Sequence, residues 1–252
     1  MHSKSFLGKR FEFKYLLNAK TAKQVEKYLL ERTRMTPDSY SKHGAYFVNS
    51  LYFDTPLMND YRDKDGSFLV RKKLRARMYE AAWHPELDRV WLEVKHKHNM
   101  NVKKTRTTIA KEVWDDFIKN NDPLILLANL NHQGTSHPQD LRTFAEYYLH
   151  QHYRPLAVVR YRRRAYLADF ISPVRITFDY DIQTCRYENS HQKHNLIPVS
   201  HQNVVMEIKF NNKLPWWFKE LLTHFDLQRT DFSKYRNSVA VMRGIERIPV
   251  NK

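Results

Sequence analysis

The stretch VVMEIKFNN, residues 204–212, places Glu207 and Lys209 two positions apart in a segment of strand-like alternation. The same Glu-x-Lys spacing recurs in RFEFKYLL (residues 10–17), with Glu12 and Lys14, and in RVWLEVKHK (residues 89–97), with Glu93 and Lys95. Residues i and i+2 of an extended strand share a face. Each segment therefore predicts a strand with a carboxylate and an ammonium on one face and apolar side chains on the other.

The composition favours a folded protein with an anionic partner. The chain has 252 residues, 42% of them hydrophobic, and its 43 Lys and Arg against 27 Asp and Glu give a net charge of +16. Such an excess indicates nucleic acid, a membrane surface or phosphorylated molecules as partners. Cys185 is the single cysteine, which excludes an internal disulfide and a Cys-based metal site. We therefore expect a cytoplasmic protein without a membrane span.

Hydrophobic periodicity predicts an α+β fold built on antiparallel strands, as one domain over residues 1–252. Strands are expected at about 9–17, 45–53, 68–79, 89–97, 102–110, 156–168, 174–182 and 203–210. Helices are expected at 21–33, 57–63, 111–119, 139–151, 215–225 and 233–243, the first with Thr21 as its N-cap. A further short apolar helix is expected within 121–138.

Five of the expected strands carry a charged face, and this face has two interpretations. One is an ordinary sheet with its charged face in water and its apolar face on helices. The other is a sheet that curls into a barrel, so that the charged face lines a channel and helices cover the outside. The repetition of Glu-x-Lys and Arg-x-Arg favours the second. Many Lys and Arg with few carboxylates suit a polyphosphate group and its divalent metal.

Eight motifs occur in an order that resembles a known family. They are RFEFKYLL, SLYFDT, KLRARMY, WLEVKHK, YRRRAYL, VRITFDYDI, VMEIKF and DFSKYRNSV, between about residues 9 and 243. This series resembles the vacuolar transporter chaperone (VTC) domain, the polyphosphate-polymerase branch of the triphosphate tunnel metalloenzymes. The resemblance implies an antiparallel tunnel with a charged lumen. It also implies an activity that uses Mn²⁺ or Mg²⁺ and adds the γ-phosphate of ATP to a growing polyphosphate chain.

The resemblance also implies roles for individual residues. The phosphate-binding cations of the catalytic site would be Lys14, Arg75, Arg77, Lys95, Arg163, Arg175, Lys209 and Lys234. Further substrate contacts would come from Arg10, Glu12, Lys73, Glu93, Lys103 or Lys104, and Asp179. Glu207 matches the metal-ligand position.

One departure from the family pattern affects the choice between activities. Hydrolytic tunnel enzymes begin with Glu-x-Glu-x-Lys, whereas this sequence has Arg10 in place of the first Glu. The loss of that carboxylate weakens the case for a second metal or an activated water.

The alternative functions are a tunnel triphosphatase, a non-catalytic polyphosphate-binding module and an RNA-binding domain. We expect ATP and polyphosphate as partners and no nucleic acid, because the aromatic residues mostly alternate away from the charges. A membrane protein that handles the polymer is a further expected partner, and the oligomeric state stays open.

Two other segments, the Trp pair at 216–217 and the basic run at 160–164, could serve either packing or ligand binding. The pair Trp216–Trp217 is expected to pack a helix against the sheet rather than to stack on bases. The run RYRRR, residues 160–164, should divide between the two faces of a strand, with Arg163 inward and Arg162 and Arg164 outward.

Overall fold

The computed structural model describes residues 10–63, 70–80, 89–98, 101–168, 173–188, 195–200 and 202–245, without the side chains of residues 10, 70, 97–98 and 101–103. The chain forms two compact units. Unit 1 contains residues 1–46, 161–182 and 200–233, and unit 2 contains residues 47–160, 183–199 and 234–252. Each unit is described by itself.

Unit 1 is built on antiparallel strands in the order β11–β1–β10–β8. These strands are β1 (Arg10–Asn18), β8 (Val174–Arg186), β10 (Asn203–Asn211) and β11 (Arg229–Thr230), and β2 (Thr36–Pro37) pairs with β7 (Arg154–Ala168). The register places Lys14 opposite Glu207 and Glu12 opposite Lys209. The two Glu-x-Lys segments of unit 1 therefore lie on neighbouring strands with opposite charges adjacent.

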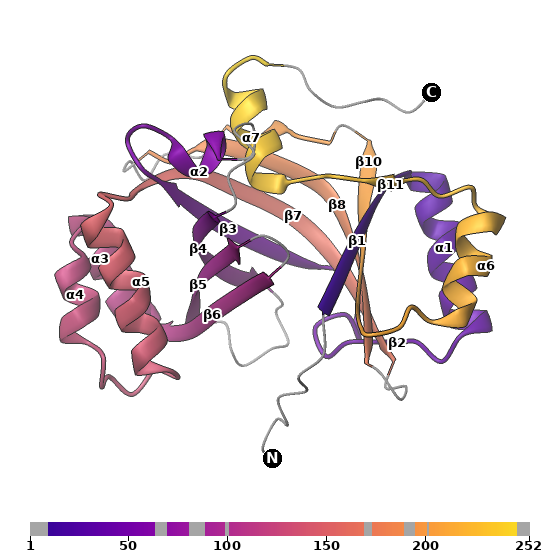
Figure 1. Cartoon of the computed structure of the whole chain (residues 1–252), viewed down its shortest axis with the longest axis horizontal. Helices are drawn as coiled ribbons and strands as arrows, with labels where there is room; N and C mark the ends of the chain where they lie inside the picture. The colour runs from indigo at the N-terminus through magenta and orange to yellow at the C-terminus, as the bar shows by residue number, and fades with distance from the viewer. Residues whose placement is uncertain are drawn as a thin grey trace. The chain divides into compact units, whose positions relative to one another are not determined.

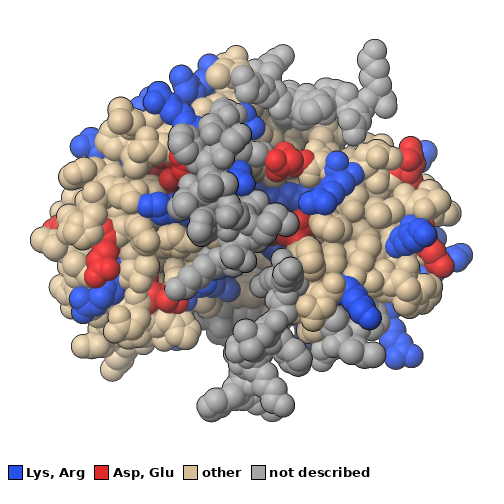
Figure 2. All heavy atoms as spheres, in the orientation of Figure 1, with Lys and Arg blue, Asp and Glu red and all other residues tan. Residues whose placement is uncertain are grey.

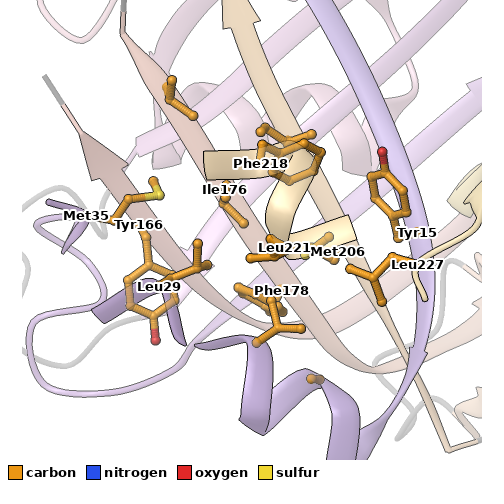
Figure 3. Packing of buried hydrophobic residues seen from close by; sticks show 14 of the residues in the cluster. Tyr15, Leu29, Met35, Tyr166, Ile176, Phe178, Met206, Phe218, Leu221 and Leu227 are labelled. Carbon is orange, nitrogen blue, oxygen red and sulfur yellow. The ribbon is translucent and has the colours of Figure 1, made fainter. Parts of the chain in front are cut away.

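Two helices cover the apolar face of this sheet, α1 (Ala19–Arg32) and α6 (Trp216–His224). Figure 3 shows Phe218 and Leu221 of α6 gathered with Ile176, Met206 and Phe178 of the strands. All five side chains are buried in one hydrophobic cluster. In the Trp pair, Trp217 is buried in this cluster whereas Trp216 is 75% exposed. The expectation of helix packing is therefore confirmed for Trp217 and wrong for Trp216, because a helix turns adjacent residues to different faces.

Shortening Ile176 to Val should lower the free energy of unfolding by about 0.5–1.5 kcal/mol, because the lost methylene leaves a small cavity in a packed core. Ile176 has no exposed surface, whereas Ile197 is 38% exposed. Ile197→Val is therefore the matched control and should change stability by less than about 0.5 kcal/mol. Urea denaturation of both variants measures the difference. Equal effects would contradict the packing at Ile176.

Unit 2 is built on consecutive antiparallel strands in the order β3–β4–β5–β6. They are β3 (Tyr46–Asp54), β4 (Val70–Glu80), β5 (Arg89–His98) and β6 (Asn101–Ala110). Helices α3 (Lys111–Asn120), α4 (Pro123–Ala128) and α5 (Pro138–His150) group beside them (Figure 1). Phe53, Leu74, Leu92, Phe117 and Phe144 form the centre of this core. The remaining elements are α2 (Asn59–Arg62), β9 (Ile197–Pro198), which pairs with β8, and α7 (Lys234–Met242).

The α+β class and the antiparallel sheet are confirmed, but closure into a barrel is not. In the described residues the strand order begins at β11 and ends at β6, and these two end strands are not paired with each other. Strand β11 contributes only two residues, so it offers little edge for another strand to pair with. None of the helices in the described ranges has the length and hydropathy that a membrane crossing requires.

Most element boundaries differ by a residue or two from the sequence predictions, and two of the differences have a clear cause. Helix α1 begins at Ala19 rather than after Thr21, because the side-chain carbonyl of Asn18 accepts the backbone N–H of Thr21 at 2.8 Å and so caps the helix. Strand β8 continues to Arg186, because Gln183 and Thr184 pair with β9.

Candidate functional site

In unit 1 the facing Glu-x-Lys segments form a cluster of four charges, here called the β1–β10 cluster: Glu12, Lys14, Glu207 and Lys209. The Lys14 ammonium lies 3.2 Å from Glu12 and 3.9 Å from Glu207, and it donates to the backbone carbonyl of Phe232 at 2.9 Å. Glu207 also forms an ion pair with Lys209. The Glu207 side chain is 7% exposed, whereas the two lysine side chains are 24% and 26% exposed. The cluster therefore buries its central carboxylate and keeps its ammonium groups accessible.

Burial lowers the pKa of Lys209, although Glu207 and Glu12 oppose this shift. An additional negative charge near Lys209 would stabilise its charged form and raise that pKa again. The charged form of Lys209 would thus be stabilised by an incoming anion.

A buried ion pair fixes Arg163 in β7. Its guanidinium donates to both carboxylate oxygens of Asp179 in β8, at 2.6 and 2.8 Å. Asp179 has no exposed surface and Arg163 is 7% exposed, whereas Arg162 and Arg164 are exposed. The predicted division of the RYRRR run between two faces is confirmed. Although burial alone would lower it, Asp179 holds the pKa of Arg163 well above its ordinary value. Arg163 is therefore a permanent charge with a fixed orientation.

Arg175 of β8 has a partner that the sequence did not indicate. Its guanidinium donates to Asp38 at 2.8 Å, and the second oxygen of Asp38 accepts the N–H of Ser41 at 2.9 Å. Asp38 lies in the loop after β2, outside any periodic segment, so no alternation pattern could have identified it.

In unit 2 a single buried carboxylate organises three cations. Glu93 is 1% exposed, and it accepts from Arg75 and Lys104 at 2.6 Å each and lies 3.1 Å from Arg106. The register places Arg75, Glu93 and Arg106 side by side on β4, β5 and β6. This group, Arg75, Glu93, Lys104 and Arg106, is here called the Glu93 cluster. Although burial raises it, the surrounding cations hold the pKa of Glu93 well below its ordinary value. The two arginines alone outnumber the one carboxylate, so the cluster has a net positive charge.

Phenolic oxygens orient the arginines of unit 2 without neutralising them. Arg75 donates to the hydroxyl of Tyr52 at 3.1 Å. Arg77 and Arg106 donate to the hydroxyl of Tyr79 at 3.4 and 3.1 Å. Burial alone would raise the pKa of Tyr52, but the charges of Arg75, Arg77 and Lys234 and the hydrogen bond from Arg75 lower it to about 8.

The sequence analysis missed Tyr52, Tyr79 and Arg106. A signal for Arg106 exists, because it alternates with Lys104 on one face of β6. Tyr79 alternates with Arg75 and Arg77 on one face of β4 in the same way. Tyr52 carries no such signal, since aromatic residues are as common on the apolar faces.

The remaining predicted residues occupy different places in unit 2. Lys95 is exposed and lies between Lys73 and Lys104 in the register. The Lys73 ammonium lies 5.3 Å from the ring centroid of Tyr235, and Lys234 is the first residue of α7. Burial lowers the pKa of Lys104 to about 7, although Glu93 opposes this shift. The side chains of Arg10 and Lys103 lie outside the described residues. The phosphate-binding role of all these residues stays a prediction.

The oxygen donors of the β1–β10 cluster fit one part of a divalent-metal site. Among the residues described, no group of three His, Cys, Asp or Glu is placed to hold a metal. Mg²⁺ and similar ions, however, are commonly held by one or two carboxylates together with substrate phosphates. Glu207, with Glu12 on the neighbouring strand, offers carboxylates of this kind. The donor set suits an ion that arrives with a phosphate substrate.

Charge alone does not locate the site on the surface. Figure 2 shows Lys and Arg side chains, with Asp and Glu among them, over much of the face that it displays. The β1–β10 cluster, the Glu93 cluster and the Arg163–Asp179 pair differ from these surface charges because their carboxylates, Glu207, Glu93 and Asp179, are buried.

Solved structures are similar to the chain over most of its length at low sequence identity. A proposed adenylate cyclase from Bacillus halodurans is 13% identical with a TM-score of 0.50, covering 89% of this chain and 95% of that one. A proposed adenylyl cyclase from Hippeastrum, described as having a dominant triphosphatase activity, is 16% identical with a TM-score of 0.48 over 95% and 98%. A Pyrococcus horikoshii protein is 12% identical with a TM-score of 0.47 over 92% and 99%.

No curated protein is significantly similar to the chain in sequence. The VTC domain, in contrast, matches residues 9–243, which is nearly the whole sequence. The chain therefore belongs to the VTC domain family.

Proposed function

We propose that this chain is an ATP-dependent polyphosphate polymerase, which transfers the γ-phosphate of ATP to a growing polyphosphate chain in a metal-containing basic tunnel. Membership of the VTC family supports a triphosphate-binding tunnel enzyme. The observation that carries the proposal is that buried carboxylates hold Lys and Arg side chains on the charged strand faces of each unit. Glu207 does so in unit 1, and Glu93 does so in unit 2.

The side chains present suit phosphoryl transfer. This reaction needs positioning and charge stabilisation and little covalent help from the protein. Arginines such as Arg75 and Arg77 would grip phosphate oxygens with a planar fork, whereas Lys14 and Lys209 would act as mobile point charges. The acceptor is itself a phosphate: its terminal oxygen bonds to the γ-phosphorus of ATP while the bond from that phosphorus to the bridging oxygen breaks and ADP leaves. The polymerase reaction therefore needs no activated side-chain nucleophile.

The triphosphate tunnel superfamily generally uses divalent metals, and the β1–β10 cluster is where this chain would hold one. Glu207 would bind the ion together with phosphate oxygens, with Glu12 close by. The ion would neutralise charge that develops on the transferred phosphoryl group. Lys14 lies opposite Glu207 on β1, and Lys209 follows it on β10. These two lysines would bind the phosphate oxygens that the metal does not.

Incubation with ATP and either Mn²⁺ or Mg²⁺ tests the proposal through its products. A ladder of long phosphate chains on a gel supports the polymerase. Orthophosphate alone would identify a triphosphatase. Tight polyphosphate binding without turnover would identify a non-catalytic module. The last two outcomes each overturn the proposal.

The affinity for inorganic triphosphate should fall steeply with salt, by at least about tenfold from low to high ionic strength, because many partly exposed cations share the ligand. Isothermal titration calorimetry at several NaCl concentrations measures the slope. Orthophosphate is the control, since it contacts fewer cations and should show a shallower slope. An affinity for triphosphate that does not change with salt would contradict a multivalent basic site.

A further inference from the structure

Asp54, at the end of β3, is a buried acceptor that collects four donors. It is 2% exposed. Its carboxylate accepts the backbone N–H groups of Thr55 at 2.7 Å, Asp60 at 3.0 Å and Tyr61 at 3.1 Å. The fourth donor is the hydroxyl of Tyr235. Three of these donors fix Asp54 to the backbone around α2, so the carboxylate is a rigid anchor for the fourth.

Tyr235 connects this anchor to α7. It is the second residue of the helix, directly after Lys234, and it is 1% exposed. Burial and the nearby Asp54 raise the pKa of Tyr235 far above its ordinary value, so its hydroxyl remains a donor. The first turn of α7 is thereby attached to the end of β3 by one directed hydrogen bond.

The ring of Tyr235 also contacts the cationic side of unit 2. It stacks on Tyr52 with a centroid separation of 5.1 Å and an interplanar angle of 28°. Tyr52 shares a face of β3 with Asp54 and accepts from Arg75, which in turn donates to Glu93. A continuous series of contacts therefore leads from Asp54 through Tyr235 and Tyr52 to the Glu93 cluster.

The neighbour of Tyr235 in this turn is Lys234, which the family resemblance assigns to the phosphate-binding cations. Lys234 is close enough to Tyr52 for its charge to contribute to the lowered pKa of that phenol, after burial and the charges of Arg75 and Arg77. A lysine carries its charge on four flexible carbons, so its helix must be fixed for that charge to occupy one place. The hydrogen bond between Asp54 and Tyr235 fixes it.

We propose that Asp54 and Tyr235 are positioning residues: their hydrogen bond sets the first turn of α7 so that the ammonium of Lys234 lies beside the Tyr52–Arg75 pair and joins the phosphate-binding cations. The proposal deepens the proposed function and rests on it for the role of Lys234. In this proposal the position of Lys234 depends on the carboxylate of Asp54, which itself contacts no substrate.

A double-mutant cycle tests the proposal without requiring turnover. Tyr235→Phe removes the hydroxyl and keeps the ring that stacks on Tyr52. Its affinity for inorganic triphosphate should fall about tenfold, as expected for the loss of a hydrogen bond to a carboxylate. Lys234→Met should weaken binding by at least as much. The double variant should bind no more weakly than Lys234→Met alone, because both changes remove the same charge from the site.

A matched control separates positioning from stability. Tyr148 is also a buried tyrosine of unit 2, and its hydroxyl donates to the side chain of Asn121. Tyr148→Phe should lower the melting temperature by a few degrees, as we also expect for Tyr235→Phe, and should leave triphosphate affinity within about twofold. Additive effects of Tyr235→Phe and Lys234→Met would overturn the proposal, and so would unchanged affinity in Tyr235→Phe.

A second measurement follows Tyr52 directly. Its phenol should titrate at a higher pH in both Tyr235→Phe and Lys234→Met, because each change takes a positive charge away from it. Ultraviolet difference spectra against a Tyr52→Phe variant report this titration, and an unchanged titration in Tyr235→Phe would overturn the proposal. A wild-type protein that binds triphosphate but makes no polyphosphate would instead contradict the proposed function, while the binding cycle would still decide the positioning role.

Discussion

Glu207→Gln should abolish metal-dependent turnover of ATP, by at least about a hundredfold, and leave the protein folded. The neutral amide is a poor ligand for a hard divalent cation, and a lost metal removes several kcal/mol of charge stabilisation in the transition state. Glutamine can still accept a hydrogen bond from either lysine. Lys14 and Lys209 are about a quarter exposed, so water can solvate their charges. Triphosphate binding should therefore partly survive.

A purely structural role for Glu207 gives a different result. If it only balanced the lysines as a buried ion pair, its removal would cost about 3–5 kcal/mol of stability. Thermal melts and ATP turnover across a Mn²⁺ titration distinguish the two roles. Glu26→Gln is the matched control, since Glu26 is a buried carboxylate of the same unit, paired with Arg164 at 3.1 Å outside the β1–β10 cluster. The control should lose stability and keep turnover. Full metal-dependent activity in Glu207→Gln would remove this residue from the mechanism.

Glu93→Gln should destabilise the protein by about 1.5–3 kcal/mol, because it leaves three neighbouring cations, Arg75, Lys104 and Arg106, without their shared counterion while water solvates their charges only in part. Urea denaturation at neutral pH measures the loss. Glu80→Gln is the control on a neighbouring strand, since the Glu80 side chain is 53% exposed and its ion pair with Arg160 lies at 3.2 Å in water. That change should cost less than about 1 kcal/mol. Equal losses in the two variants would contradict the organising role of Glu93.

The pH dependence of this loss has a definite sign. The pKa of Glu93 in the folded protein is well below the ordinary value of 4.5. A carboxyl group with a depressed folded pKa contributes its full stability above the unfolded pKa and loses it as the pH falls through the folded one. The difference in stability between wild type and Glu93→Gln should therefore be largest above pH 4.5 and shrink at more acidic pH. A difference that grows on acidification would refute this account.

Local sequence patterns were sufficient to predict most elements. The alternation of charged and apolar residues in RFEFKYLL and VVMEIKFNN gave β1 and β10 and the correct charged face of each. Such local patterns do not predict which strands pair, because Glu12 lies opposite Lys209 only through pairing between segments that are distant in the sequence. Closure of the sheet is likewise a property of strand pairing and cannot be read from a single face.

The candidate site shows the same division. The cations follow from alternation on strands, whereas their orienting partners do not. Asp38 lies in a loop, and Tyr52 occupies a strand whose other residues are largely apolar. The sequence predicts Thr21 as the cap of α1, whereas Asn18, at the end of a strand, caps the helix by accepting the backbone N–H of Thr21.

The pairing of β1 with β10 also constrains how the molecule can be made. At about 5–20 residues per second, roughly 10–40 s of synthesis separate the appearance of β1 from that of β10. During that time the nascent chain carries β1 and the apolar side of α1 without their partner strand. In contrast, β3 pairs with β4, β4 with β5 and β5 with β6, so these strands can pair as they leave the ribosome. Strand β1 is therefore synthesised well before the strand that secures it, and its apolar side chains stay without that partner until β10 emerges.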